Sequence, residues 1–224
     1  MRAGGLEGAG ADLAAVRSLA EGLGGDAKPL VGTSGTLMLT LGGLDRVGTE
    51  EDAIDGGYRV DTENFVIGLA DRGIRSSVSR LPPVVHSSLD EHGFVPMLIE
   101  VARATGRSGY VGKAPTAGRP PTRWMSRGST AWPWRVSPAG SRLHAVDDDG
   151  IPLRRIAEAI GTHLGVPTAS IDPQDVQAHF GFAAFVVTLD NPTTSARTRE
   201  LLDWEPTHPG LLADLAEGHY FSAA

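Results

Sequence analysis

The sequence predicts an α/β fold in which helices alternate with the strands of a parallel sheet. The stretch Gly73–His86 (GIRSSVSRLPPVVH) has the short, β-branched character of a buried strand and ends in two prolines. A helix that ends at Gly73 precedes it, and Lys28–Val31 is an earlier strand candidate. The order strand, loop, helix, strand predicts a right-handed crossover. Ligands bind at the carboxyl ends of strands in such sheets, so the prolines mark the expected ligand side, although an ordinary proline-rich strand exit explains them equally well.

The remaining elements follow from apolar spacing and from glycine or proline at their ends. Helices are predicted over residues 11–23, 59–71, 93–105, 152–164, 173–180, 197–202 and 209–220. Further strands are predicted over residues 141–146 and 166–171, and a surface loop over residues 41–57. The glycine-rich residues 1–10 are expected to lack regular structure.

Composition sets the class of protein. The chain has 224 residues, of which 41% are hydrophobic, and a net charge of -7, so it can bury a core but offers no general electrostatic surface for nucleic acid or an anionic membrane. It has no cysteine, which excludes disulfides and thiolate chemistry and fits a cytoplasmic protein. No apolar run approaches the roughly 20 residues of a membrane span.

Residues 113–138 differ in character from the rest of the chain. They hold three of the four tryptophans, several arginines and prolines, and no helical or strand period. A Trp/Arg interaction surface is one interpretation. The other is a pair of compensating frameshifts, because codons exist that spell GANRWPPADALDVARLYRLAVESV from the third nucleotide of the Lys113 codon. That peptide has a helical period.

Several side chains are candidates for chemistry by residue type alone. Ser34 follows a predicted strand and can donate a hydrogen bond to a substrate carbonyl, and Tyr58 can transfer a proton if a nearby cation lowers its pKa. Arg59 and Glu63 lie on the same predicted helix. His86 is a lone histidine for which a structural role is at least as good an explanation. No metal site is expected, since the acidic residues 147–149 lack the spacing of a calcium loop.

Four motifs in order resemble the extended or atypical short-chain dehydrogenases, and more narrowly the NAD-dependent epimerase/dehydratase group. They are Val31–Thr36 (VGTSGT), Arg80–His86 (RLPPVVH), His92–Pro96 (HGFVP) and Thr198–Pro206 (TRELLDWEP). The resemblance covers about residues 11–112 and 139–221. It implies the C-terminal part of a Rossmann-like parallel sheet, a small α+β substrate-binding region, NAD or NADP as cofactor, and hydride transfer at the carboxyl ends of the strands.

The resemblance also implies roles for individual residues. Ser34 takes the place of the catalytic serine, with Tyr58 and Arg59 as the other catalytic candidates. The implied cofactor-binding residues are Thr33, Ser34, Pro82, Pro83, Val84 and Val85. The implied substrate-binding residues are Thr36, His86 and Phe94.

The chain departs from the family pattern in two ways. Arg59 and Glu63 stand at the positions of the family's Tyr-x-x-x-Lys pair. Tyr58 stands one residue before the tyrosine position, and a shift of one residue turns a side chain by about 100° around a helix. No Gly-x-x-Gly-x-x-Gly or Gly-x-Gly-x-x-Gly turn follows a strand, so the first, phosphate-binding half of a Rossmann domain is expected to be missing. We therefore expect a truncated chain with impaired catalysis.

Three regions and three functional hypotheses result. Residues 1–112 are the expected partial cofactor-binding region, residues 113–138 an irregular, frameshifted linker, and residues 139–224 the expected substrate-binding region. The leading hypothesis is an NAD(P)-binding oxidoreductase or epimerase acting on a small-molecule hydroxyl or carbonyl. The alternatives are a non-catalytic small-molecule or protein-binding module and an interaction protein acting through residues 113–138. A homo-oligomer could cover the open sheet edge.

Overall fold

The computed structural model describes residues 3–23, 28–57, 59–112, 123–124, 137–147 and 150–222. The chain forms two compact units, each assembled from three separate segments. Unit 1 comprises Met1–Leu81, Ser129–Ala145 and Thr194–Glu205. Unit 2 comprises Pro82–Gly128, Val146–Thr193 and Pro206–Ala224. Along the chain, the first passage from unit 1 to unit 2 falls between Leu81 and Pro82.

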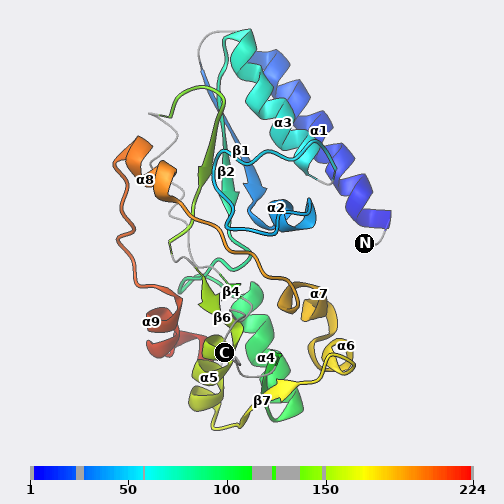
Figure 1. Cartoon of the computed structure of the whole chain (residues 1–224), viewed down its shortest axis with the longest axis vertical. Helices are drawn as coiled ribbons and strands as arrows, with labels where there is room; N and C mark the ends of the chain where they lie inside the picture. The colour runs from blue at the N-terminus through cyan, green and yellow to red at the C-terminus, as the bar shows by residue number, and fades with distance from the viewer. Residues whose placement is uncertain are drawn as a thin grey trace. The chain divides into compact units, whose positions relative to one another are not determined.

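Unit 1 contains a parallel three-stranded sheet in the order β1-β2-β5. Its strands are β1 (Pro29–Gly35), β2 (Arg75–Leu81) and β5 (Ser141–His144). Its helices are α1 (Ala3–Leu23), α2 (Leu37–Leu41), α3 (Val60–Gly68), the 3-10 turn η1 (Leu69–Arg72) and α8 (Ala196–Leu202). Helix α3 packs against β1 and β2, and α1 packs against α3 (Figure 1). The α/β fold and the crossover from β1 through α3 to β2 are confirmed.

Local sequence explains how this sheet is built. Gly73 has a φ of 77°, and this left-handed turn ends η1 and leads the chain into β2. Strand β2 stops at Leu81, directly before the two prolines, as predicted. Ala20, Leu69 and Ile74 form a small core between α1 and the start of β2. The prediction that residues 1–10 lack regular structure is wrong from Ala3 onward, where α1 begins. The helix propensity of alanine favours α1, and the glycines in this segment do not interrupt it.

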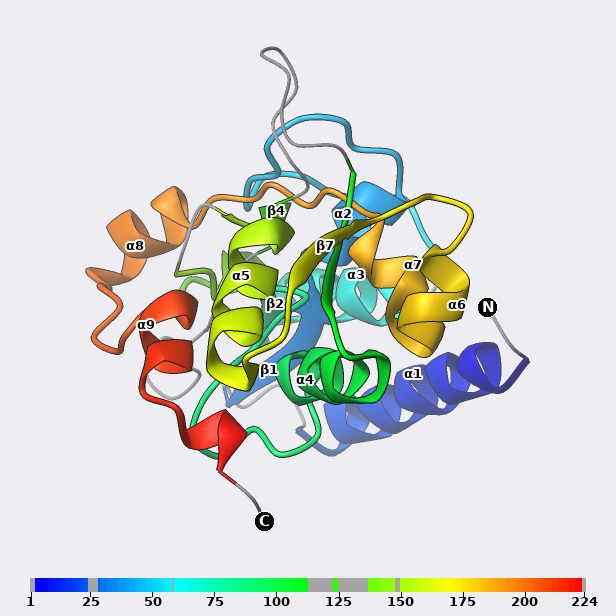
Figure 2. The same cartoon turned by 90° about the horizontal axis from the view of Figure 1, so that it is seen from below.

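Unit 2 is largely helical around two short pairs of strands. Its elements are α4 (Phe94–Thr105), β3 (Ser108–Val111), β4 (Arg123–Trp124), β6 (Ile151–Pro152), α5 (Leu153–Leu164), β7 (Thr168–Ile171), α6 (Val176–Phe180), η3 (Gly181–Ala183), α7 (Ala184–Val187), α9 (Leu211–Ala216) and η4 (His219–Phe221). Strands β3 and β7 pair in parallel, and β4 pairs antiparallel with β6. Helices α4 and α5 pack against β3 and bury one apolar core (Figure 2). Only residues 123–124 and 137–138 of the Trp/Arg/Pro block are described, so the frameshift hypothesis lies outside the described residues.

None of the helices within the described ranges combines the length and apolar character that crossing a membrane requires.

Candidate functional site

Three polar side chains lie in one row across the sheet of unit 1, near the carboxyl ends of its strands. The register pairs Ser34 of β1 with Arg80 of β2, and Arg80 with His144 of β5. Residues directly opposite one another in neighbouring strands project from the same face of a sheet. All three are buried, and the Arg80 residue is only 1% exposed. A buried guanidinium requires partners, and these come from α3.

Glu63 of α3 is the principal partner of Arg80. Arg80 donates from Nη2 to Glu63 Oε1 at 2.5 Å and from Nε to Glu63 Oε2 at 3.1 Å, which is a bidentate ion pair. Arg142 of β5 donates from Nε to the same Oε1 at 2.9 Å. Burial alone raises the pKa of Glu63, but the hydrogen bond and charge of Arg80, with Arg142, hold it below its ordinary value. Glu63 is therefore an ionised carboxylate shared by two guanidinium groups.

His144 is neutral, and its hydrogen bonds fix its tautomer. Its Nδ1 lies 2.8 Å from the carbonyl oxygen of Thr194, which can only accept, so Nδ1 carries the proton. Nε2 then accepts from Nη1 of Arg80 at 3.3 Å. Burial lowers the pKa of His144, and the positive charge of Arg80 adds to this, against the opposing charge of Glu50.

The loop before α3 completes the surroundings of Arg80. The carbonyl oxygen of Asp52 accepts from Nη2 of Arg80 at 2.8 Å. The Asp52 side chain is held by Arg46, whose hydrogen bond lowers the pKa of Asp52 to about 2. Glu50 is buried and accepts through Oε1 from the N–H and hydroxyl of Thr198, at 2.7 and 2.6 Å. The segment predicted as a plain surface loop thus contributes a buried carboxylate and a backbone acceptor.

Ser34 is the hydroxyl-bearing member of the row. The residue is 7% exposed, and no described group meets hydrogen-bond geometry with its Oγ. Its hydroxyl nevertheless lies on the side of Glu63, where hydrogen bonding to the carboxylate helps to lower the pKa of Glu63. A buried hydroxyl without a partner at a strand end is suited to donate a hydrogen bond to an oxygen of a ligand.

The other predicted residues of unit 1 take different positions. Arg59 is exposed at the start of α3, with a φ of 58°, and lies 3.8 Å from the carboxylate of Asp12 on α1. Thr33 is exposed, whereas Thr36 is fully buried and donates its N–H to the carbonyl of Leu81 at 2.9 Å. Tyr58 lies outside the described residues.

The remaining predicted residues belong to unit 2, where the chain continues from β2. Pro82 and Val84 are buried, Pro83 is half-buried and Val85 is exposed. His86 is fully buried, and its Nδ1 lies 2.6 Å from Oδ2 of Asp214 on α9.

Phe94, at the start of α4, packs at the edge of the core of unit 2. Next to His86, the backbone N–H of Ser87 donates to the Tyr220 hydroxyl at 2.9 Å. Burial raises the pKa of Tyr220, and the charges of Asp90 and Asp214 add to this, so Tyr220 stays protonated. The Tyr220 hydroxyl also donates to Oδ2 of Asp90 at 3.5 Å, so the loop after β2 is joined to the C-terminal segment through His86, Ser87 and Asp90.

Sequence reasoning missed most of these partners. Arg80 and Arg142 stand within predicted strands, and a charged residue on a buried strand is itself a signal that an opposite charge faces it. The contacts from His86 and Ser87 to Asp214 and Tyr220 join residues more than 120 positions apart, and no local pattern indicates them.

Comparison with known proteins places the chain in a family. No family model matches the sequence. The uncharacterized protein C2A9.02 of Schizosaccharomyces pombe is 37% identical over 212 residues, which cover 94% of this chain and 71% of the yeast protein. The uncharacterized protein YLL056C of Saccharomyces cerevisiae is 38% identical over 213 residues, covering 91% of this chain and 68% of that protein. The chain belongs to the same family as these two yeast proteins.

Solved structures have a similar fold. MoeE5, solved with UDP-glucuronic acid and NAD, matches with a TM-score of 0.60 and 13% identity over 92% of this chain and 67% of its own. A short-chain dehydrogenase/reductase superfamily protein from Agrobacterium tumefaciens with bound NAD matches with a TM-score of 0.62 and 13% identity, over 94% of this chain and 71% of its own. This chain therefore has a Rossmann-like α/β fold.

Proposed function

We propose that this protein is an NAD(P)-dependent oxidoreductase or epimerase of the short-chain dehydrogenase group that acts on a hydroxyl or carbonyl of a small molecule. The observation that carries the proposal is the buried hydroxyl of Ser34 at the carboxyl end of β1, for which no group in the described part of the chain meets hydrogen-bond geometry. It stands where the resemblance places the catalytic serine. Nucleotide sugars are the first substrate class to test, because MoeE5 was solved with UDP-glucuronic acid.

The residues of the chain fit one end of such a cofactor. The Ser34 hydroxyl, which has no partner in hydrogen-bond geometry among the described residues, can bind a ligand oxygen next to a nicotinamide ring. For the pyrophosphate the chain has no glycine-rich turn after a strand, and we assign none of its residues to that end. When bound, the nicotinamide ring accepts or returns a hydride.

The side chains of this protein have different roles in the proposed reaction. Ser34 donates a hydrogen bond to the reacting oxygen of the substrate and orients it. Glu63 does not replace the lysine of the family pattern, because its charge is opposite and both guanidinium groups keep it ionised. It therefore neither donates a proton nor lowers the pKa of a tyrosine, and Tyr58 stays the candidate proton donor.

The first test is titration of the folded chain with NADH and NADPH, followed by cofactor fluorescence. We expect saturable binding, and turnover with NAD or NADP and a nucleotide sugar that falls about a hundredfold in Ser34→Ala. Ser18→Ala, at an exposed serine on α1, is the matched control and should leave turnover unchanged. The full-length S. pombe relative tested in parallel is the reference for a longer member of the family. Failure of the folded chain to bind either cofactor contradicts the proposal.

The second candidate is a non-catalytic module that binds a small molecule or a protein. It is favoured by the fixed ion pairs of Glu63 at the position where the family carries its lysine. Saturable cofactor or ligand binding without turnover, unchanged in Ser34→Ala, is the result that selects this candidate over the enzyme.

A further inference from the structure

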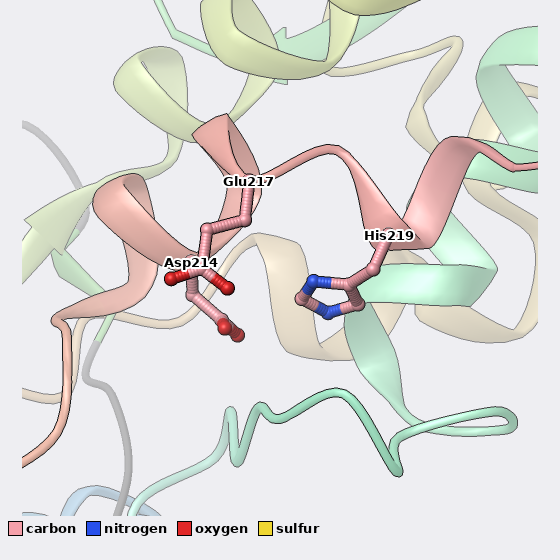
Figure 3. Close-up of side chains that lie close together, drawn as sticks. All are labelled: Asp214, Glu217 and His219. Atoms are coloured by element: carbon pink, nitrogen blue, oxygen red, sulfur yellow. The ribbon is translucent and has the colours of Figure 1, made fainter.

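The C-terminal segment of unit 2 gathers three potential metal ligands that the proposed function does not use. Asp214, Glu217 and His219 each offer one ligand atom, and these atoms all lie within 4.8 Å of one another. Figure 3 shows the two carboxylates and the imidazole ring directed into the same space. All three come from a stretch of six residues, so a single turn of chain builds the group.

The backbone explains how so short a stretch converges. Asp214 lies in α9, and Glu217 follows its last residue. Gly218 then adopts a φ of 82°, a left-handed conformation that favours glycine, and its N–H donates to the carbonyl of Leu215 at 3.2 Å. This reversal brings His219, the first residue of η4, back beside the end of α9.

Neighbouring contacts fix two of the three ligands. Asp214 is buried, and one of its oxygens is bound by Nδ1 of His86 at 2.6 Å, which leaves the other oxygen for a ligand. The ring of His219 lies against that of Tyr220, with 4.2 Å between centroids. Tyr220 is in turn held by the N–H of Ser87. Metal sites in proteins are oriented by supporting contacts of this kind.

One further observation points to a cation. Nε2 of His219 is inaccessible to solvent and has no hydrogen-bond partner among the described residues. A ring nitrogen buried in this way is satisfied by a metal ion or by another donor.

We propose that Asp214, Glu217 and His219 form a binding site for a divalent transition-metal ion, with Zn²⁺ as the first candidate. Two carboxylate oxygens and one imidazole nitrogen are a ligand set that zinc accepts at about 2.0–2.2 Å, with a further position for water. Ligand atoms of a tetrahedral zinc ion lie roughly 3.5 Å apart, so atoms as much as 4.8 Å apart must approach one another by about 1 Å, and the exposed Glu217 side chain can rotate to allow this. The ion ties the C-terminal segment to the loop of His86 and is independent of the proposed cofactor chemistry.

Calorimetric titration of the chelator-treated, 224-residue chain with Zn²⁺ tests the site. We expect one ion per chain and a rise in melting temperature on zinc addition. Glu217→Gln and His219→Phe should each weaken binding at least tenfold and remove the zinc-dependent rise. Phenylalanine keeps the ring contact with Tyr220, so His219→Phe separates ligation from packing.

Matched controls lie in the same unit. Glu91→Gln and His208→Phe change exposed residues of the same types and should leave zinc binding unchanged. The proposal is overturned if the parent chain shows no saturable binding, or if Glu217→Gln and His219→Phe bind as the parent does. Equal affinity for Mg²⁺ overturns the metal class, since imidazole selects transition metals over magnesium.

Discussion

At the scale of single residues, the main feature of unit 1 is a carboxylate shared by two guanidinium groups. Glu63 and Arg80 are both almost fully buried, whereas Arg142 is partly exposed. Removing one partner of a buried pair leaves the other charge without compensation, which is far more damaging than losing a surface pair. The three residues therefore differ in importance, although all belong to one network.

Glu63→Gln is expected to lower the free energy of unfolding by about 3–5 kcal/mol, because it leaves Arg80 charged and buried. Urea denaturation followed by circular dichroism measures this loss. Arg142→Gln is the matched comparison and should cost about 1 kcal/mol or less, because water reaches Arg142. A loss below 1 kcal/mol in Glu63→Gln would show that the pair does not stabilise the fold.

His144 predicts a pH dependence of stability. Its pKa in the folded protein is lowered, chiefly by burial, while in the unfolded chain it titrates near its ordinary value of about 6.5. Below that pH the unfolded state binds more protons, so stability falls as the pH falls and is fully present above about pH 7. Urea denaturation between pH 5.5 and 8 should show a shallower slope in His144→Gln. In the exposed control His208→Gln the slope should equal that of the parent.

At the scale of elements, two helical glycines predict opposite effects of the same substitution. In α5, a Cβ at Gly161 would meet Thr168 Oγ1 at 2.7 Å and the Val166 carbonyl at 2.9 Å. In α3, a Cβ at Gly68 meets nothing within 4 Å. The first glycine lets β7 approach α5, whereas the second has no packing role.

Gly161→Ala is therefore expected to lower the free energy of unfolding by about 1 kcal/mol or more. The cost of fitting the extra methyl group against Thr168 and Val166 exceeds the stabilisation that the higher helix propensity of alanine provides. Gly68→Ala should raise it by up to about 1 kcal/mol. Thermal denaturation of both variants tests the pair, and a stabilising Gly161→Ala would contradict the close approach of β7.

The elements also show what the sequence could and could not reveal. Helix α4 was predicted over residues 93–105 and spans Phe94–Thr105, because its apolar spacing and its flanking glycines are both local signals. Strand β3 was not predicted, because Ser108–Val111 is short and contains glycine. It is recognisable as a strand only from its pairing with β7. The sequence predicts Glu63 on the helix before β2, where α3 places it. Its ion pairs depend on strand register, which the sequence alone does not determine.

At the scale of the whole molecule, the described residues form a separate apolar core in each unit. We expect Glu63→Gln to accelerate amide hydrogen exchange mainly in β1, β2 and β5. Gly161→Ala should act mainly on β3 and β7. Local destabilisation raises exchange first in the cooperative unit that contains it, and mass spectrometry of exchanged peptides resolves the two sets of strands. Equal acceleration in both sets for both variants would show that the chain unfolds as one cooperative unit.

The shared carboxylate also restricts which side chains position 63 can accept. A lysine there would match the pattern of the short-chain dehydrogenases that the sequence resembles, but beside Arg80 and Arg142 it would place three positive charges together. Glu63→Lys alone is therefore expected to destabilise unit 1, and replacing Arg80 alone leaves Glu63 without its principal partner. An engineered lysine at this position consequently requires a change at Arg80 in the same variant.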